Sequence, residues 1–252
     1  MNPRSLLTVV GLVSAIVLTG QTKAGDRRFT YSYEATTAPK GTVELETWVT
    51  WKARLSDAGN NDQFDFRHEL ELGITDRLQL GLYFSDWSVV RQSGHTKADW
   101  KKAAVEVIYN LSNPTTDFIG SAIYGEVFLG EELFGLEGKL ILQRNFGPWM
   151  VVYNATIEAE WEGSGFDEQI GELKNSLGVS YQVSPKFSVG AELFTEVEFE
   201  DWKDAGDHAI YAGPNFSIRT GNFFATTTVL FQTTGIAGEP DVQTRLIFGF
   251  NF

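Results

Sequence analysis

The sequence predicts an all-β fold: a transmembrane antiparallel up-and-down β-barrel of about twelve strands. Apolar and polar residues alternate along almost the whole chain after Lys40, which is the period of a β-strand. Short turns and longer loops alternate between these runs. The chain also ends on a strand pattern, because Leu246, Phe248, Phe250 and Phe252 fall on one face. Chain ends are normally polar and frayed, so this last strand must have a partner.

The first 24 residues have the pattern of a secretory signal peptide. Arg4 provides a positive start, residues 6–18 form an apolar core too short to span a bilayer as a helix, and Thr22 and Ala24 are small residues at the cleavage positions. We expect cleavage after Ala24. The predicted organisation is a signal peptide at 1–24, an N-terminal segment at 25–40 that is periplasmic or tucked into the lumen, and the barrel at 41–252.

The predicted strands each place apolar residues on one face and polar residues on the other. The first sets Leu45 and Val49 against Glu44 and Glu46, and the later runs repeat this alternation. Each run is about 10–14 residues long, whereas strands of soluble sheets have about 5–6. The expected spans in chain order are 41–54, 63–74, 77–90, 100–111, 118–129, 133–146, 148–162, 171–183, 186–200, 207–219, 222–233 and 240–252.

The connections agree with a barrel whose two termini lie on the same side of the membrane. Gly, Pro, Asn and Asp, which suit tight reversals, occur at 75–76, 113–114, 147–148, 184–185 and 221–222. Longer polar loops lie near 55–62, 91–99, 163–170, 201–206 and 234–239, with a short one at 130–132. This regular alternation predicts short turns at one end of the barrel and loops at the other.

Aromatic residues collect at both ends of the predicted strands, as they do at the lipid headgroups around membrane barrels. We expect one girdle at Tyr109, Trp149, Tyr181, Phe187, Phe216, Phe223 and Phe252, and the other at Trp51, Phe64, Trp100, Phe134, Trp161 and Phe199. The final strand should close the barrel against the first. Its pattern of Leu246, Phe248, Phe250 and Phe252 is similar to the signal that the barrel-assembly machinery recognises in bacterial outer-membrane barrels.

Composition limits the partners of the chain. It has 252 residues, with 20 basic and 33 acidic side chains and zero cysteines. Loss of Arg4 and Lys23 with the signal peptide would change the net charge from −13 to −15. This sign is wrong for nucleic acid, and the missing cysteines exclude disulfides. The expected location is the bacterial outer membrane.

Catalytic and metal-binding patterns are weak. The three histidines are His68, His95 and His208, and none is followed by serine in the His-x-Ser spacing of barrel lipid hydrolases. A nucleophilic pair could still form across strands, so a lipid hydrolase stays open as an alternative. Residues 57–62 lack the ligand order of a calcium loop. We therefore predict no enzyme, no metal ion and no cofactor.

The face that should line the lumen carries two charged groups. The seventh to ninth strands contribute Glu158, Glu160, Glu172, Glu196 and Glu198, with Lys174 among them. The first two strands contribute Lys52, Arg54 and Arg67, beside Asp65, Glu69 and Glu71. These groups should face one another across the barrel and orient polar solutes. The alternative is a closed structural barrel in which the charges interlock as a salt-bridged plug.

Glycines are also frequent on the predicted inner face. They are Gly73, Gly81, Gly125, Gly178, Gly190 and Gly249, and most of them have inward parity. Because glycine has no side chain, we expect them to leave room inside the barrel. This expectation favours an open pore over a plug.

Two parts of the chain resemble a known group of proteins. They are "ATTAPKGTVELETWVTWK" (35–52), and "GPNFSIRTGNFFATTTVLFQ" (213–232) with "DVQTRLIFGFNF" (241–252). The group is a broad set of proteobacterial-type outer-membrane barrels, some described as transporters and some as meta-pathway phenol-degradation proteins. The resemblance implies a barrel and a role in transport. We expect a passive porin-like channel for small polar or cationic solutes, with membrane lipid as its surroundings and an oligomeric state that is left open.

Overall fold

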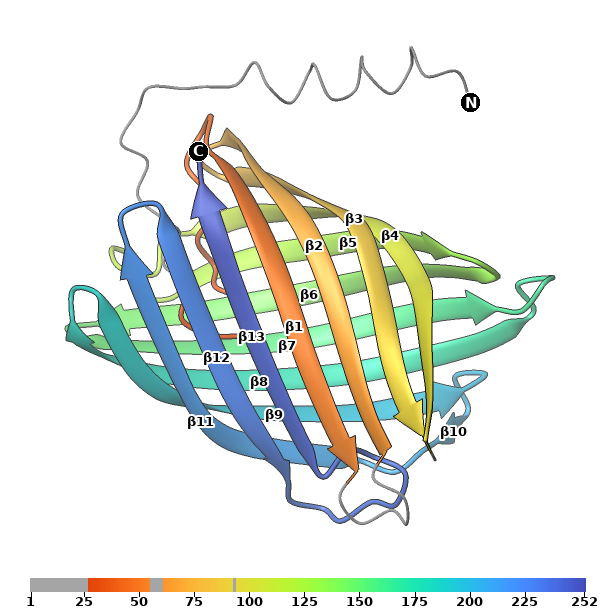
Figure 1. Ribbon diagram of the computed structural model, residues 1–252. Coiled ribbons are helices and arrows are strands. Elements are labelled where there is room, and N and C mark those ends of the chain that lie inside the picture. Colours follow the sequence, from red (N-terminus) through yellow and green to blue (C-terminus); the bar gives the residue numbers. More distant parts are fainter. Residues whose placement is uncertain (1–26, 55–60, 93) are drawn as a thin grey trace, which may run out of the picture.

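The computed structural model describes residues 27–54, 61–92 and 94–252, and the predicted signal peptide lies outside them. Figure 1 shows an all-β molecule. No helix among these residues has the length and apolar character needed to cross a bilayer. The strands are β1 (Val43–Arg54), β2 (Asn61–Thr75), β3 (Leu78–Gln92), β4 (His95–Ser112), β5 (Gly120–Gly130), β6 (Leu133–Phe146), β7 (Trp149–Glu162), β8 (Glu168–Ser184), β9 (Phe187–Glu200), β10 (Asp204–Ala205), β11 (Ala209–Thr220), β12 (Phe223–Gln232) and β13 (Val242–Asn251).

All of these strands except β10 close into one antiparallel barrel. Neighbours in the sequence pair with each other, β9 pairs with β11, and β13 returns to β1. Phe248 of β13 lies opposite Thr47 of β1, and the N–H of Phe252 donates to the Val43 carbonyl at 2.9 Å. The two-residue strand β10 pairs with the end of β9. The predicted twelve-strand barrel, closed by the last strand, is confirmed.

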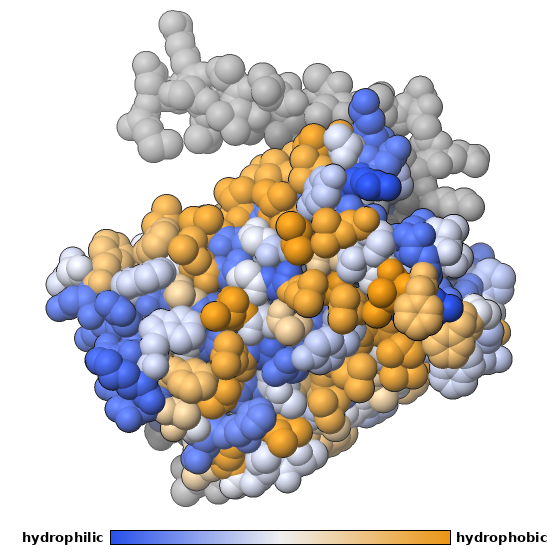
Figure 2. Space-filling view, turned by 180° about the vertical axis from the view of Figure 1, so that it is seen from behind, coloured by the Kyte–Doolittle hydropathy of each residue, from blue (hydrophilic) through white to orange (hydrophobic). Residues whose placement is uncertain are grey.

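Each strand presents one apolar face outward and one face to the lumen. In β5, Ile123 and Leu129 are 49% and 56% exposed, whereas the alternate residues Tyr124 and Phe128 are 5% and 1% exposed. Figure 2 shows apolar side chains spread over this face of the outer wall, with hydrophilic ones gathered toward both ends of the barrel. An exposed apolar belt of this extent on a closed barrel is the surface that lipid covers. The protein is therefore a membrane barrel of the bacterial outer-membrane type, as predicted.

Aromatic rings from adjacent strands meet near both ends of the barrel. Trp149 and Tyr181 have ring centroids 4.8 Å apart, and Phe134 and Trp161 have centroids 5.4 Å apart. The first pair lies where β7 leaves a tight turn, in which Gly147 has a φ of 57°. We call the end with the short connections the turn end and the opposite one the loop end.

Two connections differ from the expected ones. Strands β3 and β4 continue to pair as far as Gln92 and His95, so the expected loop at 91–99 is mostly a hairpin that extends the loop end. At the turn end, the connection of residues 113–119 is longer than a tight turn. There the side-chain carbonyl oxygen of Asn113 accepts bonds from the N–H groups of Thr115 and Thr116, at 2.8 and 3.2 Å. Such side-chain bonds hold an Asx turn that the dipeptide Asn-Pro alone does not specify.

A β-bulge interrupts the pairing of β2 with β3. His68 lies opposite Ser85, whereas the next residue, Glu69, lies opposite Tyr83, so Phe84 is the extra residue. Bulges bend a strand and change the direction of nearby side chains. This bulge lies beside a group of buried carboxylates in the lumen.

Candidate functional site

The lumen has two parts along the barrel axis. Near the loop end is a cavity of about 520 Å³, which we call the vestibule. Toward the turn end, residues 27–42 run inside the barrel before they enter β1, drawn in red behind β13 and β1 in Figure 1. We call residues 27–42 the lumen segment. The candidate site therefore consists of a charged vestibule above an occupied inner half.

Glu192 of β9 is the main anchor of the lumen segment. Its carboxylate accepts the backbone N–H groups of Thr30, Tyr31 and Ser32 at 3.0, 2.9 and 2.8 Å. It also accepts the hydroxyl proton of Thr228, and the side chain is only 2% exposed. Several successive N–H groups that meet one carboxylate form a concave anion site with charge-assisted bonds. Here the anion belongs to the barrel wall, so the wall fixes the path of the segment.

Amide side chains of the wall bind the rest of the segment. Asn154 accepts from the Tyr33 N–H at 2.6 Å and donates to the Tyr33 carbonyl at 3.0 Å. Gln143 accepts from the N–H of Ala35, and Gln79 from the N–H of Ala38, both at 2.7 Å. Irregular backbone at membrane depth needs such partners, because no bulk water satisfies it. Side chains thus replace the strand partner that the segment lacks.

The segment fills the space left by inward-facing glycines. Phe29 is fully buried, and a Cβ at Gly178 would lie 2.6 Å from its ring. A Cβ at Gly73 would collide with the Pro39 backbone. Gly73 and Gly178 therefore do not widen a pore, because the lumen segment occupies the space beside them. A Cβ at Gly125, in contrast, would meet nothing within 4 Å, so that glycine does leave open space.

The predicted lumen charges of β1, β2 and β7–β9 mostly line the vestibule. Lys174 is 3.1 Å from Glu158 and also contacts Glu172. Across the barrel, Lys52 is 3.0 Å from Asp65, and Arg67 is 2.9 Å from Asp86. The vestibule lining also includes Arg54, Glu196 and Glu198. Within the described ranges, no salt bridge reaches Glu160, Glu196 or Glu198.

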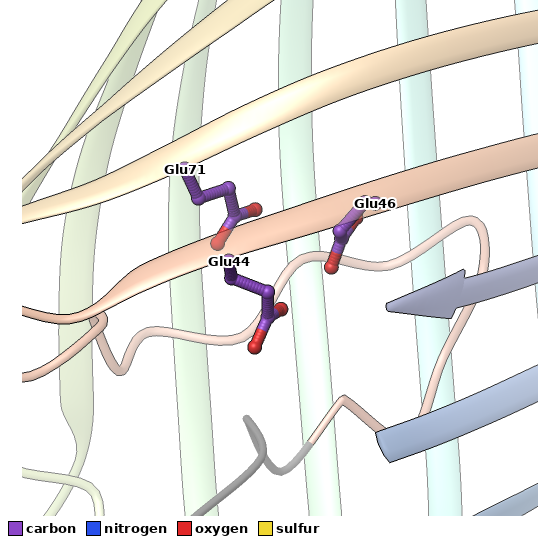
Figure 3. A group of neighbouring side chains, drawn as sticks. All are labelled: Glu44, Glu46 and Glu71. Atoms are coloured by element: carbon purple, nitrogen blue, oxygen red, sulfur yellow. The ribbon is translucent and has the colours of Figure 1, made fainter. Parts of the chain in front are cut away.

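Two of the predicted lumen residues lie deeper in the barrel than the vestibule. Glu69 and Glu71 are 0% and 7% exposed and lie below the vestibule, in the half that the lumen segment occupies. Glu44, Glu46 and Glu106 are buried with them. Figure 3 shows Glu44 and Glu46 of β1 and Glu71 of β2 with their carboxylates directed toward the same interior space. The inward parity of these residues was readable from the sequence, but their convergence depends on strand register.

Glutamates form a continuous row across the wall. Glu44 lies opposite Glu71, Glu71 opposite Gly81, and Gly81 opposite Glu106. The pairing continues without a break through β5 to β9. The members, which we call the glutamate row, are Glu44, Glu71, Glu106, Glu126, Glu137, Glu158, Glu172 and Glu198.

The glutamate row connects the two parts of the lumen. Glu44 is next to the start of β1 at the turn end, whereas Glu198 is near the loop end of β9. Because barrel strands are tilted, a row of paired residues winds up the wall rather than circling it at one height. Glu126, Glu137, Glu158, Glu172 and Glu198 line the vestibule. Acidic side chains therefore extend from the vestibule into the inner half.

Basic side chains neutralise only part of the negative charge of the glutamate row. In the described part of the chain, salt bridges to the row come from Arg27, Lys139 and Lys174. Two further members are bound by neutral groups: Tyr83 donates to Glu106, and Tyr124 donates to Glu126 at 2.5 Å. Like charges on directly opposed strand positions repel. Acidic side chains of the row therefore outnumber the cations that contact them among the described residues.

One histidine contact lies on the outer face. His68 Nδ1 is 3.1 Å from the Thr47 hydroxyl, and its ring stacks on Phe84 with centroids 6.1 Å apart. Within the described residues, no carboxylate is in hydrogen-bond contact with this ring. His95 and His208 are exposed at the loop end. The His68 contact satisfies two polar groups at the lipid face and lacks the orienting third group of a catalytic triad.

The closed antiparallel barrel, the apolar outer face and the polar lumen define an outer-membrane β-barrel. The chain belongs to the family of unknown function DUF6662, whose model matches residues 21–246. No curated protein matches it.

Solved barrels share the fold at low identity. The COG4313 outer membrane channel from Pseudomonas putida F1 is similar with a TM-score of 0.64 at 12% identity, over 92% of this chain and 100% of that chain. The NanC porin gives 0.55 at 9% identity, over 82% and 98%. The translocator domain of the autotransporter NalP from Neisseria meningitidis gives 0.53 at 10% identity, over 99% and 96%. At these identities the likeness concerns the fold alone.

Proposed function

We propose that the protein is an outer-membrane channel for small cationic or polar solutes, controlled by its own lumen segment. The observation that carries the proposal is the glutamate row, which extends from the vestibule into the inner half of the barrel. Mobile cations can compensate such a row, since few fixed cations do. Two of the similar solved barrels are named as a channel and a porin, which agrees with this function. The sequence resemblance to the transporter and meta-pathway phenol-degradation-like group also agrees with transport, and it names no solute.

Passage through the inner half requires the lumen segment to move. Interior residues beside it, such as Gln143 and Ser180, are 1% and 0% exposed, so water does not reach them past the segment. Side-chain hydrogen bonds hold the inner part of the segment, with Glu192 accepting three of its N–H groups, whereas Gly41 and Thr42 at its end bond the backbone of Gly73. Such bonds can be exchanged for water when the segment shifts, and the barrel ladder stays intact.

The test is conductance in planar bilayers, with Glu192→Ala compared with the wild type. The substitution leaves buried N–H groups without acceptors, at a cost of about 1–3 kcal/mol each. We expect the segment to leave its seat and the open time to increase several-fold. Glu168→Ala is the control, because Glu168 is exposed at the start of β8 and far from the segment.

The closed structural barrel is the alternative that this experiment separates. Its support is the set of vestibule ion pairs, such as Lys52 with Asp65 and Lys174 with Glu158. If wild type and Glu192→Ala are both silent in bilayers while the barrel remains folded, the lumen is a structural plug and the channel proposal fails.

The lipid-hydrolase alternative depends on the Thr47–His68 contact. Phospholipid cleavage that disappears in His68→Ala and persists in His95→Ala would establish it. We expect no cleavage by the wild type, because the pair lacks an orienting carboxylate.

A further inference from the structure

Three buried carboxylates converge where β2, β3 and β4 line the inner half of the lumen. Oxygens of Glu69, Glu71 and Glu106 all lie within 4.8 Å of one another. Calcium takes oxygen ligands at about 2.3–2.6 Å, so two oxygens on one ion are at most about 5 Å apart. The spacing of the three carboxylates therefore matches the ligand shell of a single ion.

Glu69 makes no hydrogen bond and no salt bridge within the part of the chain that the structure describes. The side chain is 0% exposed, and neither carboxylate oxygen has a hydrogen-bond partner among the described residues. One oxygen of Glu106 is in the same state, while the other accepts from Tyr83. Buried polar atoms nearly always have partners, because burial without one is costly. These unbonded oxygens point toward a group that the described residues do not supply.

Gly81 keeps the space between the carboxylates open. It lies opposite Glu71 on one side and Glu106 on the other. A Cβ at this position would collide with the Glu69 carboxylate and lie 2.8 Å from the Glu106 carboxyl carbon. The bulge after His68 brings Glu69 into the same space. The backbone thus forms a cradle that any larger residue at position 81 would fill.

Few positively charged side chains lie near the three carboxylates. Arg27 of the lumen segment is 2.9 Å from Glu46 and 3.7 Å from Glu71. Its Nε and one terminal nitrogen have no hydrogen-bond partner among the described residues, so they do not bond Glu69. Lys139 is engaged by Glu137 at 2.9 Å, and Arg67 by Asp86. A second acidic group, Glu44, Glu46 and Glu71, adjoins the first and adds further negative charge.

We propose that Glu69, Glu71 and Glu106 bind a divalent cation, with calcium preferred over magnesium. A divalent charge would pair the unbonded oxygens and reduce the repulsion among the three carboxylates. Magnesium keeps several of its waters and requires a tight octahedron. Glu69 and Glu106 are both 0% exposed to solvent, and the ligands on offer are carboxylates, which favours the larger and more easily dehydrated ion.

Ion binding is measured on the purified full-length barrel in detergent, without reference to conductance. Terbium is the probe, because it takes calcium-like oxygen ligands and its emission is sensitised by a nearby phenol such as Tyr83. We expect one terbium ion per chain at the sensitised site. Calcium should displace it at concentrations at least ten-fold lower than magnesium.

Two variants locate the ion. Glu69→Gln has the same shape and lacks the charge, so it should weaken terbium binding at least ten-fold. Gly81→Ala should abolish the sensitised signal while all three carboxylates remain. Glu168→Gln, which removes an exposed charge, should bind as the wild type does. Absence of sensitised binding in the wild type, or equal affinity in Glu69→Gln and wild type, would overturn the proposal, because the carboxylates would then be held by protons alone.

Discussion

Glutamates on the lumen wall lie in three kinds of surroundings, and the surroundings determine the role of each side chain. Glu192 accepts three backbone N–H groups and positions a segment of chain. Glu158 pairs with Lys174 in the vestibule. Glu69 faces other carboxylates and has no hydrogen-bond partner among the described residues. The sequence composition does not distinguish these three glutamates. The strand register gives them different neighbours, so Glu192 anchors the segment, Glu158 forms an ion pair and Glu69 is a candidate cation ligand.

The facing of neighbouring residues can be tested with one charge placed on either side of the wall. Leu70 has outward parity in β2, and Glu71 is buried in the lumen beside other carboxylates. Leu70→Arg should lower the free energy of unfolding by about 2–4 kcal/mol, because arginine near the bilayer midplane is costly. Glu71→Arg should cost less, since Glu44, Glu46 and Glu69 surround the new charge. Denaturant unfolding in lipid vesicles measures both.

Equal losses in the two variants would contradict this assignment of inside and outside. Leu72→Arg, two residues further along the same outward face, is the positional control. It should also lower the free energy of unfolding, but by less than Leu70→Arg, because Leu72 lies nearer the turn end of β2 and so nearer the interface.

Strands are the elements that the sequence predicts well here, for a physical reason. A strand with one face in lipid and one in a polar lumen must alternate, so the period of two persists along the lipid-facing part of each strand, such as all of β12 and β13. The hairpin of β3 and β4 was underestimated, because residues 91–99 are polar on both faces and project beyond the belt. Polar residues can pair as strands without leaving a hydrophobic pattern.

The lumen segment could not be predicted from its sequence in the same way. Residues 27–42 form no strand in the structure, and several of their bonds go to wall residues more than 100 positions away, such as Asn154 and Glu192. The alternation of the sequence shows that those wall residues face inward, but it does not show what they bind. The glutamate row was missed for a related reason, since its members come together only through the stagger of the strands.

Closure by the last strand gives a prediction about assembly. The Phe252 N–H bonds the Val43 carbonyl, and Phe250 lies opposite Leu45. Phe252→Asp places a charge where β13 meets β1, and deletion of Phe252 leaves a gap there. Both variants remove the terminal aromatic residue, so the amount of barrel in the outer membrane should fall several-fold. Membrane fractionation with heat-modifiability on gels measures folded barrel. Phe231→Asp changes an outward aromatic residue of β12 away from the junction of β13 and β1, and a loss as large in that variant would show that the terminal position has no special role.

In the intact barrel, charge is distributed so that the vestibule has an acidic wall and a partly basic one. Glu158, Glu160, Glu196 and Glu198 come from β7 and β9, with Lys174 of β8 between them. Lys52 and Arg67 belong to the opposite wall and are already engaged by Asp65 and Asp86. Lys52 and Arg67 are therefore held in place rather than free to cross. We therefore expect the selectivity of the proposed channel to depend on the acidic wall.

Neutralising that wall tests selectivity with a single set of variants. Two charges about 6 Å apart interact by roughly 3 kcal/mol at an effective dielectric near 20, so an acidic wall should concentrate cations strongly. Changing Glu158, Glu160, Glu196 and Glu198 to Gln should shift the reversal potential in a salt gradient away from the cation value. Because Glu192→Ala should hold the channel open, the comparison is made in that background. The control converts the exposed loop-end residues Glu131, Glu132, Asp167 and Glu168 to their amides, which removes the same charge outside the lumen and should leave the reversal potential nearly unchanged. An equal shift in both sets would mean that overall charge, and not the vestibule wall, selects the ion.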